Sequence, residues 1–131
     1  CGSGILAIAA LKLGARCALG VDNDPQAVFA SRDNAQRNGI DADDFAVVMP
    51  SDGVIAEWSG KADLMVANIL AGPLMELADQ LISLTAPGRA ILLTGVLEAQ
   101  APQLIERYRD INLNVNQERD GWVLLEGQKP S

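Results

Sequence analysis

The sequence contains no histidine and only two cysteines among its 131 residues. The absence of histidine excludes histidine-based catalytic triads and histidine-ligated metal sites within this chain, and we expect no bound metal. Two cysteines, Cys1 and Cys17, do not make a disulfide framework and are typical of a reducing compartment, which indicates the cytoplasm. No apolar run approaches the roughly 20 residues that a transmembrane helix needs, so we expect no membrane attachment.

Basic residues are also scarce, because ten Lys and Arg stand against 17 Asp and Glu and give a formal net charge of −7. This balance argues against direct nucleic-acid binding and against attachment to anionic membranes. A basic partner such as a lysine-rich protein would suit the charge, although acidity that only keeps the protein soluble also explains it. The length fits one domain or part of one.

Helix and strand patterns alternate along the chain. Apolar residues at helical spacing, together with proline and glycine at the expected ends, predict helices at residues 5–13, 25–38, 54–58, 72–84 and 102–109. Short β-like runs predict strands at residues 17–21, 45–49, 62–67, 89–94, 111–117 and 122–126. Pro87-Gly88 predicts a turn, and Asp120-Gly121 predicts a tight hairpin. The first helix is apolar on nearly all sides, so we expect it to be largely buried.

This alternation predicts the α/β class, with a parallel sheet, right-handed crossovers and helices on both faces in three layers. The closing hairpin adds an antiparallel strand. We expect residues 1–131 to belong to one domain that binds a cofactor. The chain begins inside its first motif, so we expect a further strand to precede Cys1, outside this sequence.

A glycine-rich stretch, Gly2-Ser3-Gly4, leads directly into the first predicted helix. Glycine lets a ligand approach the backbone closely, and the helix N-terminus presents unpaired N–H groups. Asp22 ends the next predicted strand, 18 residues after Gly4, where a carboxylate can bind both hydroxyls of a ribose. The combination indicates a site for a nucleoside cofactor, although the loop together with Ala7 also fits the dinucleotide-binding pattern.

Polar residues follow several of the predicted strands. In parallel sheets, ligands bind beyond the carboxyl ends of the strands. The residues that this rule brings to one edge are Gly2, Gly4, Asp22, Asp52, Asn68 and Thr94. Asp22 either binds a ribose or caps a helix beside Asp24, and Asp52 either accepts from an adenine amino group or is a polar turn residue. The Asn68 amide either orients a reacting amine or forms a turn.

Several runs of the sequence resemble the ribosomal protein L11 methyltransferases. The most specific is Asn68-Ile69-Leu70-Ala71-Gly72-Pro73-Leu74, which generic S-adenosylmethionine-dependent enzymes lack. The other matching runs are residues 1–10, 20–28, 34–35, 38–39, 87–88 and 94–97. The resemblance therefore covers essentially the whole sequence.

The resemblance implies a Rossmann-like methyltransferase sheet of order 3-2-1-4-5-7-6, with the last strand antiparallel and strand 1 outside this chain. It implies S-adenosylmethionine as cofactor, with Gly2 and Gly4 at its methionine part, Asp22 at its ribose hydroxyls and Asn68 at the reacting end. It implies methylation of lysine side chains or the N-terminal amine of ribosomal protein L11, by a protein that is monomeric when full length. A further glycine of the family's loop and its substrate-recruiting domain are expected to precede Cys1.

The residues after Asn68 narrow the implied substrate. The related amide and base aminomethyltransferases carry Asn-Pro-Pro-Tyr here, whose ring can stack on a planar substrate, whereas this chain carries Asn68-Ile69-Leu70-Ala71. The missing ring disfavours nucleic-acid bases and glutamine amides and favours flexible alkyl amines. The alternatives are a methyltransferase acting on another protein lysine, a non-catalytic partner-binding domain, and a nicotinamide-dependent oxidoreductase. The oxidoreductase alternative lacks support, because the sequence places no histidine and no Tyr-Lys pair near the strand ends to donate a proton.

Overall fold

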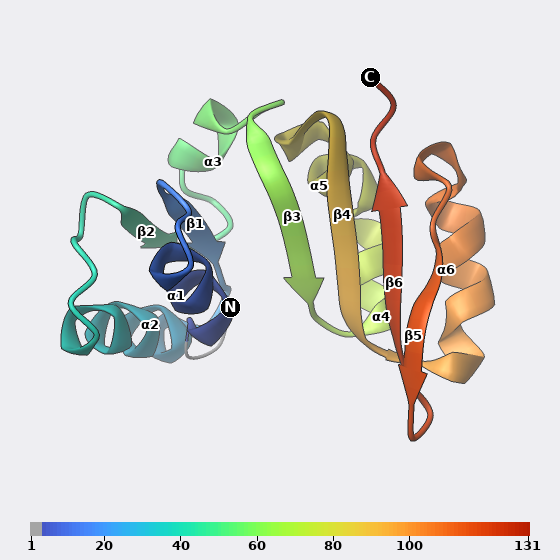
Figure 1. The fold of residues 1–131 in the computed structure, drawn as a ribbon, viewed down its shortest axis with the longest axis horizontal. Coiled ribbons are helices and arrows are strands. Elements are labelled where there is room, and N and C mark those ends of the chain that lie inside the picture. Colours follow the sequence, from blue (N-terminus) through green and yellow to red (C-terminus); the bar gives the residue numbers. More distant parts are fainter. Residues whose placement is uncertain (1–3) are drawn as a thin grey trace. The chain divides into compact units, whose positions relative to one another are not determined.

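The computed structural model describes residues 4–131 (Figure 1). Backbone contacts divide the chain into two compact units, Cys1–Gly53 and Val54–Ser131, and each is described by itself. None of the helices within residues 4–131 is long and apolar enough to cross a membrane. That residues 1–131 form one domain stays a prediction.

The first unit joins two parallel strands to two helices. Its elements are α1 (Ile5–Lys12), β1 (Ala18–Val21), α2 (Pro25–Arg37) and β2 (Phe45–Val48). The strands pair in register from Ala18↔Phe45 to Val21↔Val48. The buried residues of its core are Ile8, Val28, Ala35, Phe45 and Val47.

Local chemistry sets both ends of α2. Asp24 has an extended backbone, and its Oδ1 accepts a hydrogen bond of 2.9 Å from the N–H of Gln26, so Asp24 caps the helix that Pro25 begins. Gly39 has a φ of +74° just beyond the helix, a left-handed conformation that commonly ends helices. Both signals are visible in the sequence, and the predicted helix, residues 25–38, differs from α2 by one residue.

The prediction that the first helix is largely buried is wrong. Ile8 is the buried residue of α1, whereas Ile5 and Leu6 are 64% and 54% exposed. Within this unit, α1 contacts β1 and α2. A short helix that is apolar on all sides can therefore cover only one of its faces in this unit.

The second unit is a four-stranded sheet, and the helices within residues 71–84 and 101–107 pack on one of its faces (Figure 1). Its helices are α3 (Val54–Glu57), α4 (Ala71–Glu76), α5 (Ala78–Leu84) and α6 (Ala101–Arg107), with short 3-10 turns at Glu98–Gln100 and Arg109–Ile111. Its strands are β3 (Ala62–Asn68), β4 (Thr85–Leu97), β5 (Asn114–Arg119) and β6 (Trp122–Gln128). The strand order is β3-β4-β6-β5.

These two sheets follow the predicted strand order. The orders β1-β2 and β3-β4-β6-β5 are the 3-2 and 4-5-7-6 parts of that prediction. β3 and β4 are parallel, and β6 is antiparallel to both β4 and β5. The predicted α/β class and these parts of the predicted strand order are confirmed.

The longest strand, β4, differs from its prediction. Pro87-Gly88 does not separate it from the preceding helix, because the strand already begins at Thr85. Ala62 pairs with Thr85 but Leu64 pairs with Ala90, so β4 has additional residues at this point. Gly88, with a φ of +79°, lies in this irregular segment. The predicted turn is therefore a bulge within the strand. The hairpin prediction is confirmed, since Asp120 and Gly121 both have positive φ between β5 and β6.

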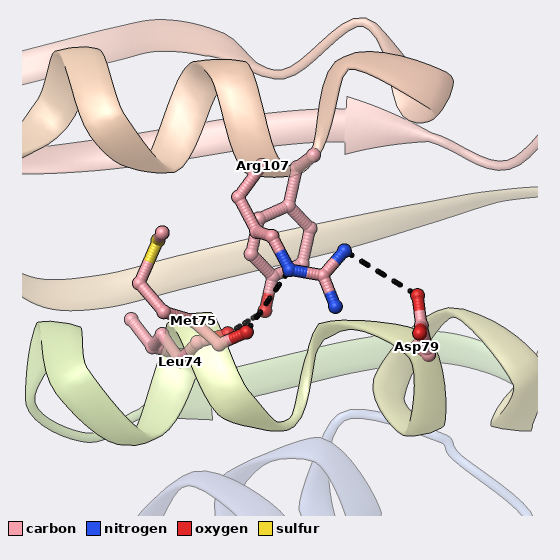
Figure 2. Close-up of polar contacts among 5 residues, drawn as sticks. Leu74, Met75, Asp79 and Arg107 are labelled. Carbon is pink, nitrogen blue, oxygen red and sulfur yellow. Dashed lines mark hydrogen bonds and ion pairs between the residues drawn. The ribbon is translucent and has the colours of Figure 1, made fainter.

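The predicted helix at residues 72–84 is interrupted at Leu77, which separates α4 from α5. Figure 2 shows how α6 and the residue after it bind the carbonyl groups near this break. The buried Tyr108 hydroxyl donates to the Leu74 carbonyl at 2.6 Å, and Arg107 Nε donates to the Met75 carbonyl at 3.1 Å. Arg107 also pairs with Asp79 of α5 at 3.4 Å. These contacts satisfy carbonyls of the last turn of α4.

Burial of the Tyr108 side chain disfavours its charged form. Desolvation raises the pKa of Tyr108 from 10.0 to about 12, and the positive charge of Arg107 opposes this rise only in part. The phenol therefore stays a hydrogen-bond donor to Leu74 throughout the physiological pH range.

Replacing Tyr108 by phenylalanine should lower the free energy of unfolding by about 1–3 kcal/mol, because the buried Leu74 carbonyl then loses its donor. Chemical denaturation of the complete protein would measure the change. The matched control is Arg109→Ala. It removes an exposed ion pair with Glu106 at 3.0 Å, and such pairs contribute at most about 1 kcal/mol. Equal losses in the two variants would contradict the assignment.

Alkaline pH should remove part of the same stabilisation. Because the folded-state pKa of Tyr108 is raised above 10.0 to about 12, the contribution is complete below pH 10 and is lost as the pH rises toward 12. We expect the stability of the wild type to fall more steeply across this window than that of Tyr108→Phe. Denaturation at several alkaline pH values would show this, and parallel curves would rule it out.

Candidate functional site

The glycine loop is described from Gly4 onward, and Gly2 and Ser3 lie outside the described residues. Gly4 is buried and has a φ of +80°. A Cβ placed on it would lie 3.1 Å from Ser31 Cβ and 3.3 Å from Ser31 Cα. Glycine is therefore required here both for the left-handed conformation and for the close contact with α2.

The N-terminus of α1 begins immediately after this glycine. Gly4 is its N-cap residue, and no side chain caps the helix there. The first N–H groups of a helix lack partners within the helix and form the positive end of its dipole. This end of α1 is thus chemically suited to a negatively charged or strongly accepting ligand group.

The acidic residue after β1 is held by a local turn. The Asp22 N–H donates to the Val48 carbonyl at 3.1 Å, which fixes its backbone beside the end of β2. Its Oδ1 accepts a hydrogen bond of 2.9 Å from the N–H of Asp24. Asp22 therefore orients the N-cap residue of α2, while Asp24 caps the helix itself. This arrangement fixes a half-buried carboxylate at the carboxyl end of β1.

Asp52 lies in the exposed turn after β2, where its N–H donates to the Met49 carbonyl at 3.0 Å. It borders an open hollow of about 510 Å³ between the end of β2 and α2. The lining residues are Pro25, Val28, Phe29, Arg32, Val48, Met49, Ser51 and Asp52. Arg32 spans this side, because its Nη2 donates to the Val47 carbonyl at 2.6 Å. Asp22 and Asp52 thus follow adjacent parallel strands, as predicted.

In the second unit, Asn68 is the last residue of β3 and is exposed. It pairs in register with Thr94 of the parallel strand β4, so the structure brings these two predicted residues together. The chain then continues through Ile69 and Leu70 into α4. Gly4, Asp22 and Asp52 belong to the other unit. That all of these residues form one site stays a prediction.

Two residues close to the predicted ones were missed by sequence reasoning. Ser31 is fully buried against Gly4, and nothing in the sequence distinguishes it from other polar residues of α2. Gly95 follows Thr94 and approaches the Asn68 side chain. A glycine inside a strand pattern is a known signal for a bulge or a close backbone approach, so Gly95 was open to prediction.

Within the part of the chain that the structure describes, no three Cys, Asp or Glu side chains are placed to hold a metal ion. Among the same residues, Cys17 is an exposed free thiol. The polar groups at the strand ends are carboxylates, an amide and a hydroxyl, which bind ligands through hydrogen bonds.

Comparison with known proteins confirms the resemblance. Residues 1–130 match the family described as Ribosomal protein L11 methyltransferase (PrmA). The chain is 51% identical over 130 residues to the ribosomal protein L11 methyltransferase of Pseudomonas paraeruginosa and 50% identical over 130 residues to that of Tolumonas auensis. Both alignments cover 98% of this chain and 43% of the relative. The chain therefore spans less than half the length of these relatives.

Solved structures agree with this family. The crystal structure of the ribosomal protein L11 methylase from Lactobacillus delbrueckii subsp. bulgaricus is 33% identical with a TM-score of 0.80, covering 98% of this chain and 66% of that one. An RNA methyltransferase from Salinibacter ruber has a TM-score of 0.68 at 17% identity, covering 99% of this chain and 76% of that one, and shows the shared fold alone. Because the family match spans nearly all of its residues, the chain belongs to the ribosomal protein L11 methyltransferase family.

Proposed function

We propose that the protein carrying this chain transfers methyl groups from S-adenosylmethionine to amino groups of ribosomal protein L11, on lysine side chains or the N-terminal amine. The observation that carries the proposal is the family match over residues 1–130. The polar residues at the carboxyl ends of β1, β2 and β3 support it, because ligands of such sheets bind at those ends.

The proposed cofactor residues are Gly2, Gly4, Asp22, Asp52 and Asn68. The N-terminus of α1 beyond Gly4 suits the carboxylate of a methionine moiety, and the oriented carboxylate of Asp22 suits two ribose hydroxyls. S-adenosylmethionine, when bound, supplies a methyl group activated by a sulfonium. The Salinibacter ruber enzyme of the same fold was solved in complex with S-adenosyl-L-homocysteine, which is consistent with this choice.

Asn68 is proposed to hold the substrate amine. Its side-chain or backbone carbonyl can accept a hydrogen bond from the amine and so direct the nitrogen lone pair. Alignment of this kind accelerates a transfer reaction without requiring a strong base. The chain has no histidine to take the amine proton, and we assign that proton to water.

The substrate class follows from the surroundings of Asn68. Ile69, Leu70 and Ala71 offer no ring on which a planar base or amide could stack, and Leu70 is 73% exposed. A flexible alkyl amine needs only room and an acceptor, and the net charge of −7 attracts a basic protein. A ribosomal protein substrate and the free Cys17 favour the cytoplasm. That the full-length protein is a monomer and does not bind nucleic acid directly stays a prediction.

Replacing Asn68 by alanine in the complete protein should lower methyl transfer by about 100-fold, because a misplaced reacting group can cost that much. Binding of S-adenosylmethionine should change far less. Mass spectrometry of ribosomal protein L11 after incubation with the cofactor would measure transfer, and calorimetry would measure binding. Unchanged turnover would exclude the proposed role of Asn68. An L11 substrate that the wild type leaves unmodified would favour a non-catalytic partner-binding domain.

Replacing Asp22 by asparagine should raise the Kd for S-adenosylmethionine about tenfold, because hydrogen bonds to a charged acceptor contribute about 1.5–3 kcal/mol and a neutral amide keeps only part of this. Asparagine keeps an oxygen for the turn to Asp24, so the fold should be unaffected. The matched control is Asp24→Asn, which retains the helix cap and should leave the Kd unchanged. Titration with NAD in the same calorimeter tests the oxidoreductase alternative, and binding of NAD alone would overturn the proposed cofactor.

A further inference from the structure

Gly95 lies at an irregular point of β4, beside the end of β3. Leu93 pairs with Leu125 and Val96 pairs with Val123, so three steps along β4 face two steps along β6. Leu93 and Val96 are both fully buried in the same core. Side chains of a regular strand return to one face every two residues. The bulge therefore keeps both residues in the core and displaces Thr94 and Gly95 from regular pairing with β6.

The displaced segment approaches Asn68 closely. Gly95 has a φ of +76°, and a Cβ placed on it would lie 2.7 Å from Asn68 Oδ1 and 3.4 Å from the Ile69 carbonyl oxygen. The first distance is far shorter than any van der Waals contact, so the two atoms could not keep these positions. Because Oδ1 is at the end of an exposed side chain, the amide would move while the backbone stayed in place.

We propose that Gly95 is a positioning residue, which holds the Asn68 amide in its reactive orientation by having no side chain of its own. This inference rests on the proposed function of Asn68. β3 and β4 lie side by side in the sheet (Figure 1), and the pairing of Asn68 with Thr94 brings the backbone of Gly95 to the amide. The bulge fixes the backbone, and the backbone then limits where Oδ1 can lie.

A second glycine of the same unit provides a matched control. Gly60 has a φ of +68° but nothing lies within 4 Å of a Cβ placed on it. It precedes β3 at the end opposite to Asn68. Gly95→Ala and Gly60→Ala therefore introduce the same left-handed strain, and they differ in whether the new methyl group meets Asn68.

The experiment compares both variants in the complete protein. We expect Gly95→Ala to lower kcat about 10- to 100-fold, since a displacement of about 1 Å can have that effect. The Kd for S-adenosylmethionine should change less than about twofold, which is about the scatter of repeated titrations. A change of about 1.4 kcal/mol in binding free energy would shift the Kd tenfold. Gly60→Ala should keep the wild-type kcat, and the two variants should lower the Tm by similar amounts. Equal kcat in the two variants would overturn the inference. It would also be overturned if the loss of kcat in Gly95→Ala were matched by an equal loss of affinity for S-adenosylmethionine.

A double-mutant cycle shows whether the effect acts through the amide. In an Asn68→Ala background, Gly95→Ala has no Oδ1 to displace, so it should reduce the residual single-turnover rate no further. A full additional loss would show a separate role for Gly95 and would overturn the inference. The side-chain amide resonance of Asn68 in NMR should also shift in Gly95→Ala and not in Gly60→Ala. An unshifted resonance would contradict the proposal without any reference to activity.

Methyl transfer by the single variant Asn68→Ala tests the proposed role of Asn68 separately from the role of Gly95. Full methyl transfer by Asn68→Ala would remove both the role of Asn68 and that of Gly95. A strong defect in Asn68→Ala together with wild-type kcat in Gly95→Ala would retain the first and remove only the second.

Discussion

Parallel strand pairing is the constraint on which the rest of this structure depends. Two strands that run in the same direction need a long crossover between them, and α2 supplies it for β1 and β2, while α4 and α5 supply it for β3 and β4. The same pairing sends the carboxyl ends of neighbouring strands to one edge. Asp22 and Asp52 therefore follow adjacent strands, and Asn68 lies beside Thr94. Strand direction alone therefore makes neighbours of residues that are far apart in sequence, without any contact between their side chains.

The crossover after β3 also ties the Asn68 segment to the core. α4 begins at Ala71, three residues after Asn68, and its Ala71 and Leu74 side chains are buried against the sheet. α4 ends at Glu76, and the carbonyls of Leu74 and Met75 in its last turn accept hydrogen bonds from Tyr108 and Arg107. The helix that follows the proposed catalytic residue is thus held by apolar burial at one end and by hydrogen bonds at the other. α4 thus holds the backbone that follows Asn68, and pairing with Thr94 of β4 holds the backbone of Asn68 itself.

The parts of this fold that the sequence predicts are those set by neighbouring residues. Asp24-Pro25 starts a helix and Asp120-Gly121 makes a hairpin because the required backbone angles and caps are local properties. The parts that it does not predict depend on distant partners. The break at Leu77 is stabilised by Tyr108, 31 residues later in the sequence, and the two bulges of β4 depend on its register with β3 and with β6. Asp22 and Asn68 can be selected as candidate residues from the sequence, and a glycine at a strand also points to Gly95. Nothing in the sequence distinguishes Ser31, whose position against Gly4 depends on how α2 packs.

The glycines show why a motif and a structure give different reasons for the same residue. A glycine in a loop before a helix suggests that a ligand approaches the backbone, yet the atoms that a Cβ on Gly4 would meet belong to Ser31 of α2. A Cβ on Gly95 would likewise meet the Asn68 side chain of its own unit. In both cases the missing Cβ makes room for another part of the protein. Beside Gly95 this part is Asn68, a residue of the proposed site, and beside Gly4 it is Ser31, which packs against a residue of that site. Conformational freedom and space for a ligand are therefore only part of the argument for glycine at such sites. The other part is that glycine lets two protein segments approach more closely than side chains allow, and this approach sets the position of the groups that act on the ligand.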